Sequence, residues 1–149
     1  MWTLAGYFGT SILSALFPWV NAELLMLSAV PVSESRAALI WLVAAVTLGQ
    51  MTGKSVMYWI SRSASGTYAT RFRSAVEQWR SRLESHPRSA LALVLVSALV
   101  GFPPFYAVSI AAGASGMRFG RFLAVGGAAR FAHFAAVALL PHFAFKSAL

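Results

Sequence analysis

Residues 101–106 read Gly101-Phe102-Pro103-Pro104-Phe105-Tyr106 and lie in the middle of an apolar run that covers residues 90–117. Hydropathy alone would make this run one membrane helix. The prolines prevent this, because each ring clashes with the carbonyl four residues before it and the preceding residue is pushed out of the helical region. Lipid cannot satisfy the freed backbone groups, so a broken helix in a membrane is covered by protein or lines a wet cavity. The sequence predicts either a kinked span or a re-entrant hairpin whose tip, at Pro103 and Pro104, lines a site.

The composition is that of an integral membrane protein. Of 149 residues, 58% are hydrophobic and only 11% are charged, and the mean hydropathy is +0.68, whereas soluble domains usually have about 25% charged residues. The formal net charge is +8. Because the arginines stand next to apolar runs, we expect membrane lipids as partners, with anionic headgroups on the cytoplasmic face, and no nucleic acid. The absence of cysteine excludes disulfides and thiolate metal sites.

A second apolar run, residues 4–30, is also interrupted. Its first part, residues 4–17, would measure about 20 Å as a helix, which is short of the ~30 Å hydrocarbon core. Residues 17–23 then read Phe-Pro-Trp-Val-Asn-Ala-Glu, which places a proline, an amide and a carboxylate inside the run. We therefore expect another hairpin over residues 4–30, with Pro18 and Asn21 at its tip.

Two segments, residues 37–60 and 119–141, have the length and composition of full spans. Between them, residues 66–86 contain apolar positions at spacings of four, four, three and four. This is the pattern of a basic amphipathic helix, which beside membrane spans is typical of a helix that lies in the interface. The apolar positions of this face are Tyr68, Phe72, Val76, Trp79 and Leu83.

Charge placement favours the hairpin over the kinked span. The positive-inside rule places the arginine-rich segment before residue 90 in the cytoplasm. A full crossing by residues 90–117 would put Arg118 and Arg121 outside, whereas a hairpin keeps them cytoplasmic. We therefore predict one all-α, polytopic membrane domain of 149 residues, in which two re-entrant hairpins and two spans form an inverted repeat. The small residues expected to allow close helix packing are Gly49, Gly53, Gly113 and Gly127.

Four residues are candidates for a substrate or ion pathway. Glu23 is the one carboxylate inside an apolar run and could bind a proton, although a tip residue that reaches water is the alternative. Arg130 lies deep in the last span and is the natural partner of Glu23, unless it reaches the nearer interface. Lys54 is six residues from the end of its span, so a functional role and a side chain that simply reaches the interface are equally plausible. Gln50 adds neutral polarity near the same depth, and a lone histidine such as His133 is more often a packing residue.

No catalytic constellation can be argued from the residues. The chain has no Asp and no Cys, and the histidines at positions 86, 133 and 142 have no ligand spacing. We therefore predict that the protein is not an enzyme and has no catalytic residue, no metal site and no cofactor.

Three stretches together resemble the DedA family, also called the VTT or SNARE-associated domain. Residues 18–25 resemble its proline-containing hairpin with a glutamate, residues 49–62 its GxxxG pattern followed by Tyr and Arg, and residues 102–127 its second hairpin and final span. The short length resembles the small YqaA-type members. The resemblance implies a multi-pass protein of the bacterial inner membrane with two facing hairpins. It also implies lipid handling, such as translocation of undecaprenyl phosphate or phospholipid scrambling, with proton coupling as an option.

The chain also departs from the family. Larger members carry arginines around the second hairpin's proline, where this sequence has Gly101, Phe105 and Tyr106, and Lys54 stands where an acidic or amide residue is common. Lys54 and Arg130 could supply cationic charge from elsewhere. We expect a lipid translocator or scramblase-like transporter. The alternative is a non-transporting scaffold that supports envelope or membrane-protein assembly, and homo-oligomers are left open.

Overall fold

The computed structural model describes residues 2–16, 22–33, 35–63, 77–78, 81 and 85–146. Every secondary-structure element in this described part of the chain is a helix, which confirms the predicted all-α class. Most of the expected interfacial helix over residues 66–86, and the tip residues Pro18 and Asn21, lie outside the described residues. The helices are α1 (Trp2–Leu16), α2 (Ala22–Val32), α3 (Arg36–Ser63), α5 (Pro87–Val100), α6 (Phe105–Ala114) and α7 (Phe119–Lys146).

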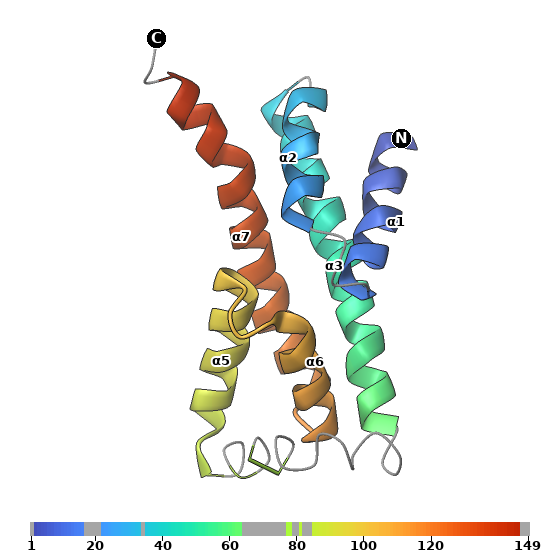
Figure 1. Cartoon of the computed structure of the whole chain (residues 1–149), viewed down its shortest axis with the longest axis vertical. Coiled ribbons are helices and arrows are strands. Elements are labelled where there is room, and N and C mark those ends of the chain that lie inside the picture. The colour runs from blue at the N-terminus through green and yellow to red at the C-terminus, as the bar shows by residue number, and fades with distance from the viewer. Residues whose placement is uncertain are drawn as a thin grey trace.

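Two long helices, α3 and α7, run in opposite directions through the molecule (Figure 1). The short helices α1 and α2 lie in the half of the molecule in which α3 begins, and α5 and α6 in the half in which α7 begins. The first helix of each short pair packs mainly on the long helix that follows it, α1 on α3 and α5 on α7. The second helix has its most extensive contact with the other long helix, α2 with α7 and α6 with α3. Both short pairs therefore hold the two long helices together.

Local signals explain where two of the helices begin. Ser35 precedes α3, and its Oγ accepts a hydrogen bond of 3.1 Å from the N–H of Ala38, which satisfies a donor that the first turn leaves unpaired. Pro87 opens α5, a position that suits proline because the N–H it lacks would have no partner there.

The chain reverses direction between α5 and α6, at the proline pair (Figure 1). α5 ends at Val100, and Gly101 follows with a φ of 84°, a left-handed conformation that glycine adopts at low cost. The N–H of Gly101 donates to the backbone oxygen of Ser97 at 2.9 Å, and Ser97 Oγ donates to the oxygen of Pro103 at 2.5 Å. These bonds satisfy backbone groups that the break exposes, and α6 begins at Phe105.

The apolar core consists of two clusters of buried residues. The first cluster is built from the second half of α3, from α5 and α6, and from the beginning of α7, and it includes Tyr58 and Phe122. The second cluster is built from α2, the first half of α3 and a later part of α7, and it includes Met26 and Phe134. Each short pair thus contributes to a separate cluster, while α3 and α7 contribute to both.

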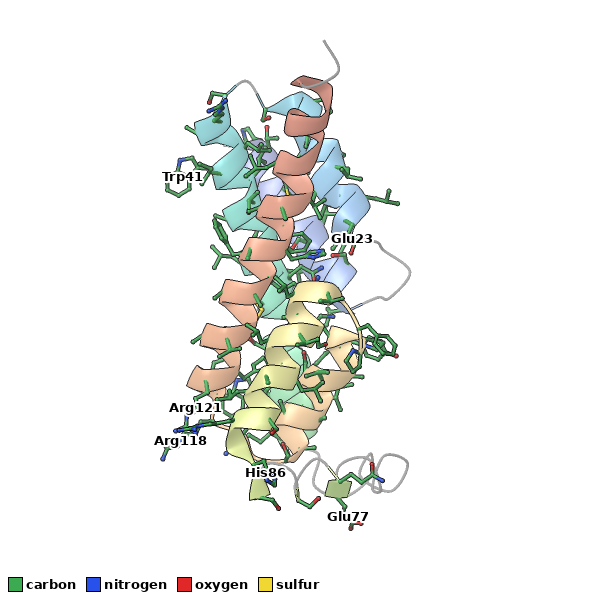
Figure 2. The ribbon with its side chains drawn as sticks, turned by 90° about the vertical axis from the view of Figure 1, so that its left-hand side faces the viewer. Glu23, Trp41, Glu77, His86, Arg118 and Arg121 are labelled. Atoms are coloured by element: carbon green, nitrogen blue, oxygen red, sulfur yellow. The ribbon has the colours of Figure 1, made fainter. Side chains whose placement is uncertain are left out.

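Helices α3 and α7 are both long and apolar enough to cross a membrane by length and composition, over Arg36–Ser63 and Phe119–Leu139. Large apolar side chains also point outward from α3, such as that of Trp41 (Figure 2). Trp41 is 66% exposed and Leu48 is 62% exposed. Trp41 and Leu48 are seven residues apart, so both lie on one face of α3. The pattern is typical of a helix that contacts lipid.

The predicted span over residues 119–141 lies within a longer helix, because α7 does not end at Pro141 and continues to Lys146. A proline inside a helix removes one backbone hydrogen bond and costs ~3 kcal/mol, but it does not force the chain to leave the helix. Pro31 lies inside α2 in the same way, so this helix ends at Val32 rather than at residue 30.

Candidate functional site

Polar side chains from several helices lie between the two apolar clusters. Along α3 the border between the clusters falls between Val46 and Met51, and along α7 it falls between Ala129 and Phe134. The structure places the predicted pathway residues at or near this border, together with one histidine. They are Glu23 on α2, Gln50 and Lys54 on α3, and Arg130 and His133 on α7.

Gln50 fastens α1 to α3. Its side chain is buried, and Nε2 donates to the backbone oxygen of Ser11 at 3.2 Å and to Oγ of Ser14. Ser11 Oγ in turn donates to the backbone oxygen of Val46 at 2.6 Å. An amide nitrogen has two N–H donors, so both are used within the protein. Gln50 therefore contributes to helix packing and has no N–H left for a ligand.

Lys54 is buried and joins the two short pairs. Its Nζ donates a hydrogen bond of 2.6 Å to the backbone oxygen of Ala15, in the last turn of α1. Carbonyls there have no partner within the helix, and the helix end carries a partial negative charge, so an ammonium is well placed. Nζ also lies 6.0 Å from the ring centroid of Tyr106, at the start of α6. An ammonium has three donors, so Lys54 can offer further hydrogen bonds to a ligand.

Arg130 lies between two aromatic rings. Its Cζ is 5.3 Å from the ring centroid of Phe105, on α6, and 5.5 Å from that of Phe134, on α7 itself. Such cation–π contacts stabilise a guanidinium by about 0.5–2 kcal/mol. Arg130 Nε is buried and has no hydrogen-bond partner among the described residues. The positive charge is attracted by Glu23 and repelled by Lys54, so this guanidinium is suited to binding an anion.

Glu23 lies in the first turn of α2, at mid-height of the molecule, and its side chain is 52% exposed (Figure 2). The sequence predicts Arg130 as its partner, and the structure places His133 at ion-pair distance, with Nε2 3.3 Å from Oε1 of Glu23. Nδ1 of His133 lies 2.7 Å from the backbone oxygen of Leu99, near the end of α5. His133 follows Arg130 by three residues, which places both on one face of α7. That spacing is the signal that could have included His133 in the predicted site.

The glycine pair on α3 allows α1 to come close. A Cβ placed on Gly49 would lie 2.5 Å from the backbone oxygen of Phe8, and one on Gly53 would lie 2.5 Å from the Cβ of Ala15. Real Cβ atoms do not approach their neighbours so closely, so both positions require glycine unless α1 moves.

The other two predicted packing glycines differ from each other. A Cβ on Gly113 would overlap the backbone of Tyr58, so α6 lies directly against α3 at this position. A Cβ on Gly127 would lie 4.0 Å from Met51, which is ordinary contact, and the tight position is the neighbouring Gly126. The close approach on α7 is therefore one residue away from the predicted position.

An open groove of about 330 Å³ lies between α1 and α2. Its lining includes several hydroxyl groups but no charged residue and none of the predicted pathway residues. The groove is lined by Thr3, Gly6, Tyr7, Thr10, Leu25 and Ser28.

Comparison with known proteins gives no match: no family model fits the chain, and searches of curated proteins and of solved structures found none either. The resemblance to the DedA family therefore stays a hypothesis that rests on the sequence stretches alone. Function has to be inferred from the site itself.

Proposed function

We propose that the chain is a membrane lipid translocator, a scramblase-like transporter for a lipid with an anionic headgroup such as a polyprenyl phosphate or a phospholipid. The observation that carries this proposal is the environment of Arg130. Its guanidinium lies between two aromatic rings, with a buried Nε that lacks a hydrogen-bond partner in the described part of the chain. A charge in the middle of a spanning helix costs about 2.5 kcal/mol or more. Binding of an anionic headgroup would explain why an arginine is kept at this position despite that cost.

The electrostatics of the site favour an anion. Lys54 and Arg130 repel each other, and a phosphate close to both would relieve this repulsion. α6 begins at Phe105, beside Arg130, and its first turn offers unpaired backbone N–H groups and the positive end of a helix dipole. Transporters with broken helices bind anionic substrate groups at such helix starts.

In the proposed arrangement, α3 and α7 cross the bacterial inner membrane, and the two short pairs are re-entrant hairpins from opposite sides. The packing of each short pair on both long helices supports an inverted repeat, because the two halves make corresponding contacts. The starts of α2 and α6 both lie in the middle of the molecule (Figure 1). Arg118 and Arg121 lie at the same end as His86, where anionic headgroups of the cytoplasmic leaflet would meet them (Figure 2).

The headgroup moves past Lys54 and Arg130 while the acyl chains remain in the bilayer. Transport requires binding that is favourable enough for entry and weak enough for release. Glu23 helps to meet this requirement, because its carboxylate attracts Arg130 and competes with the headgroup for the same cation. When no headgroup is bound, the carboxylate of Glu23 then balances part of the positive charge of the site.

Reconstitution into lipid vesicles tests the proposal. Purified protein is placed in vesicles that contain a trace of fluorescent phosphatidylglycerol, and transbilayer movement is followed by chemical bleaching of the outer leaflet. We expect faster movement than in protein-free vesicles and loss of most of this acceleration in Arg130→Met. The matched control is Arg121→Met, which changes an exposed arginine on the same helix and should retain the acceleration. Equal rates with and without protein would overturn the proposal.

A non-transporting scaffold is the alternative function. It would depend on the amphipathic face at residues 68–83, most of which lies outside the described residues. None of the contacts described above favours it. A scaffold would be indicated if the vesicle assay showed no acceleration while a stable partner complex was recovered with the protein.

A further inference from the structure

His133 contacts two other helices through its two ring nitrogens. Nδ1 lies 2.7 Å from the backbone oxygen of Leu99 at the end of α5, and Nε2 lies 3.3 Å from Oε1 of Glu23 at the start of α2. The ring itself belongs to α7, and its side chain is only 14% exposed. Because α2 and α5 belong to different short pairs, the imidazole is a junction between the two halves of the molecule.

The contact with Leu99 fixes the position of one proton. A backbone carbonyl can only accept, so the hydrogen bond requires that Nδ1 of His133 carries the proton. In a neutral imidazole, Nε2 then has no proton and presents a lone pair. This lone pair faces the carboxylate of Glu23, which when ionised is also only an acceptor. Nε2 is buried and has no hydrogen-bond partner in the described part of the chain, so the neutral ring and the ionised carboxylate are two acceptors in contact.

One added proton removes this conflict. If the proton binds Nε2, the ring becomes an imidazolium that donates to both Leu99 and Glu23. If it binds the carboxylate, the resulting acid donates to Nε2. In either form the proton comes from water, one N–H or O–H bond is made, and the charge of the pair rises by one. We propose that Glu23 and His133 form a shared proton-binding site that joins α2, α5 and α7.

Other ionisable groups act on this site from the neighbouring helices. Arg130 on α7 attracts Glu23, and Lys54 on α3 adds a second positive charge beside Arg130. Both cations attract the carboxylate of Glu23 and repel a positive charge on the ring of His133. α6 contributes Tyr106, which lies next to Lys54. The one charged residue of α5, Arg88, lies in the first turn, at the other end of that helix from the site.

A proton suits this pair better than a metal ion does. Among the residues that the structure describes, no group of three or more His, Asp or Glu side chains could hold a metal. The guanidinium of Arg130 would also repel a divalent cation brought beside it.

The proton controls how firmly the two halves are joined. With the proton bound, one ring holds the end of α5 and the start of α2 through charge-assisted contacts. Without it, the repulsion between Nε2 and the carboxylate favours release of Glu23, whose half-exposed side chain can turn to water. If the chain translocates lipids as proposed above, movement at the site becomes dependent on pH. Proton binding itself does not depend on that function.

Nitrogen-15 NMR of protein labelled at histidine tests the proton site directly. The chain has three histidines, and His133→Gln identifies the signals of His133 by their loss. We expect Nδ1 to stay protonated while Nε2 gains a proton as the pH falls, with a midpoint that changes in Glu23→Gln. The control variant Glu77→Gln, at an exposed position, should leave the midpoint unchanged. An Nδ1 without a proton, or the same midpoint in wild type and Glu23→Gln, would overturn the proposal.

A second measurement separates the proton site from the proposed transport. In the vesicle assay we expect the rate to depend on pH in wild type and its midpoint to shift in Glu23→Gln, as the NMR midpoint does, with His86→Gln as a control that keeps the wild-type profile. Glu23→Gln serves even if His133→Gln does not fold, because the Glu23 side chain is half exposed. If wild type moves no lipid, the transport proposal fails while the NMR result still decides the proton site. A pH profile that is the same in wild type and Glu23→Gln would overturn the link between proton and movement.

Discussion

Cζ of Arg130 lies 5.3 Å from the ring centroid of Phe105, the residue that follows the proline pair. The uncharged turn between α5 and α6 therefore presents an aromatic face to a cation from the last helix. The Phe105 ring is buried, and so is Nε of Arg130, which means that the positive charge has lost most of its contact with water. Such a charge weakens the fold and is retained where it has a function.

Replacing Arg130 with methionine should increase the stability of the protein. If α7 spans the membrane as proposed, removal of a charge from its middle gains about 2.5–3.5 kcal/mol, while loss of the aromatic contacts costs about 0.5–2 kcal/mol. We therefore expect the free energy of unfolding to rise by about 0.5–3 kcal/mol. Thermal unfolding in detergent micelles, followed by tryptophan fluorescence, measures the change. Arg121→Met should leave stability unchanged, and a large loss of stability in Arg130→Met would show that Arg130 supports the fold.

The Gln50→Leu variant should be less stable than wild type. Oγ of Ser14 would lose its donor in a buried position, which costs about 1–3 kcal/mol, whereas the backbone oxygen of Ser11 keeps the hydrogen bond that Oγ of Ser14 donates to it. Thr52→Val is the matched control, because Thr52 is exposed on the same helix and its Oγ1 donates to the backbone oxygen of Leu48 within that helix. Denaturant unfolding of both variants gives the comparison. Similar values for the two would mean that the Gln50 contacts do not hold α1 to α3.

The features that the sequence predicts well are local ones. The break at residues 101–104 follows from the backbone of proline and glycine, which acts regardless of the rest of the fold. The two long helices, α3 and α7, follow from apolar length alone. Pro141 shows the limit of the same rules, because a single proline can be accommodated inside a helix and the sequence does not say when.

The contacts between helices could not be predicted in the same way. Hydropathy indicates the depth of Glu23 and Arg130 but not the direction in which each side chain points, so the contact between Glu23 and His133 was missed. Neighbouring residues on a helix differ by about 100° around its axis, so a Gly-Gly pair does not tell which member faces a partner. Here it is Gly126 rather than Gly127.

Gly53→Ala should lower stability, whereas Gly6→Ala should not. The new Cβ at position 53 would lie 2.5 Å from the Cβ of Ala15, so α1 would have to move away, at a cost of about 1–3 kcal/mol. A Cβ placed on Gly6 would meet no atom of another element within 4 Å, and alanine is favoured over glycine in a helix by up to ~1 kcal/mol. The unfolding temperatures of the two variants in micelles should therefore shift in opposite directions. Equal shifts would contradict the close approach of α1 to α3.

Tyr58→Phe should loosen the contact between the end of α3 and the segment after α6. The hydroxyl of Tyr58 donates to the backbone oxygen of Met117 and accepts a hydrogen bond of 2.9 Å from Arg62. Because Tyr58 is fully buried, loss of its hydroxyl group should lower the free energy of unfolding by about 1–3 kcal/mol. Tyr106→Phe, at an exposed ring, is the control and should be nearly neutral. Unfolding by denaturant measures both. Arg62→Leu combined with Tyr58→Phe should cost less than the sum of the single changes, because the two side chains share one cluster.

Single cysteines can determine which ends of the molecule share a compartment. The chain has no cysteine of its own, so a membrane-impermeant maleimide labels only the introduced thiol. Ser89, Gly120 and Ala37 are exposed, and replacing them leaves every arginine in place, which keeps the positive-inside signal intact. We expect Ser89→Cys and Gly120→Cys to react on one side of the membrane and Ala37→Cys on the other.

This pattern of labelling distinguishes the two arrangements that the proline pair allows. Ser89 and Gly120 lie on either side of the segment that contains α5 and α6. A hairpin returns the chain to the side from which it entered, so both thiols react with a reagent added to that side. A kinked span carries the chain across the membrane, so Gly120→Cys would then be labelled from the same side as Ala37→Cys. In either arrangement α3 lies between Ala37 and Ser89 in the chain, so labelling of these two positions from opposite sides shows that α3 crosses the membrane. Labelling of both from one side would contradict the proposed membrane arrangement.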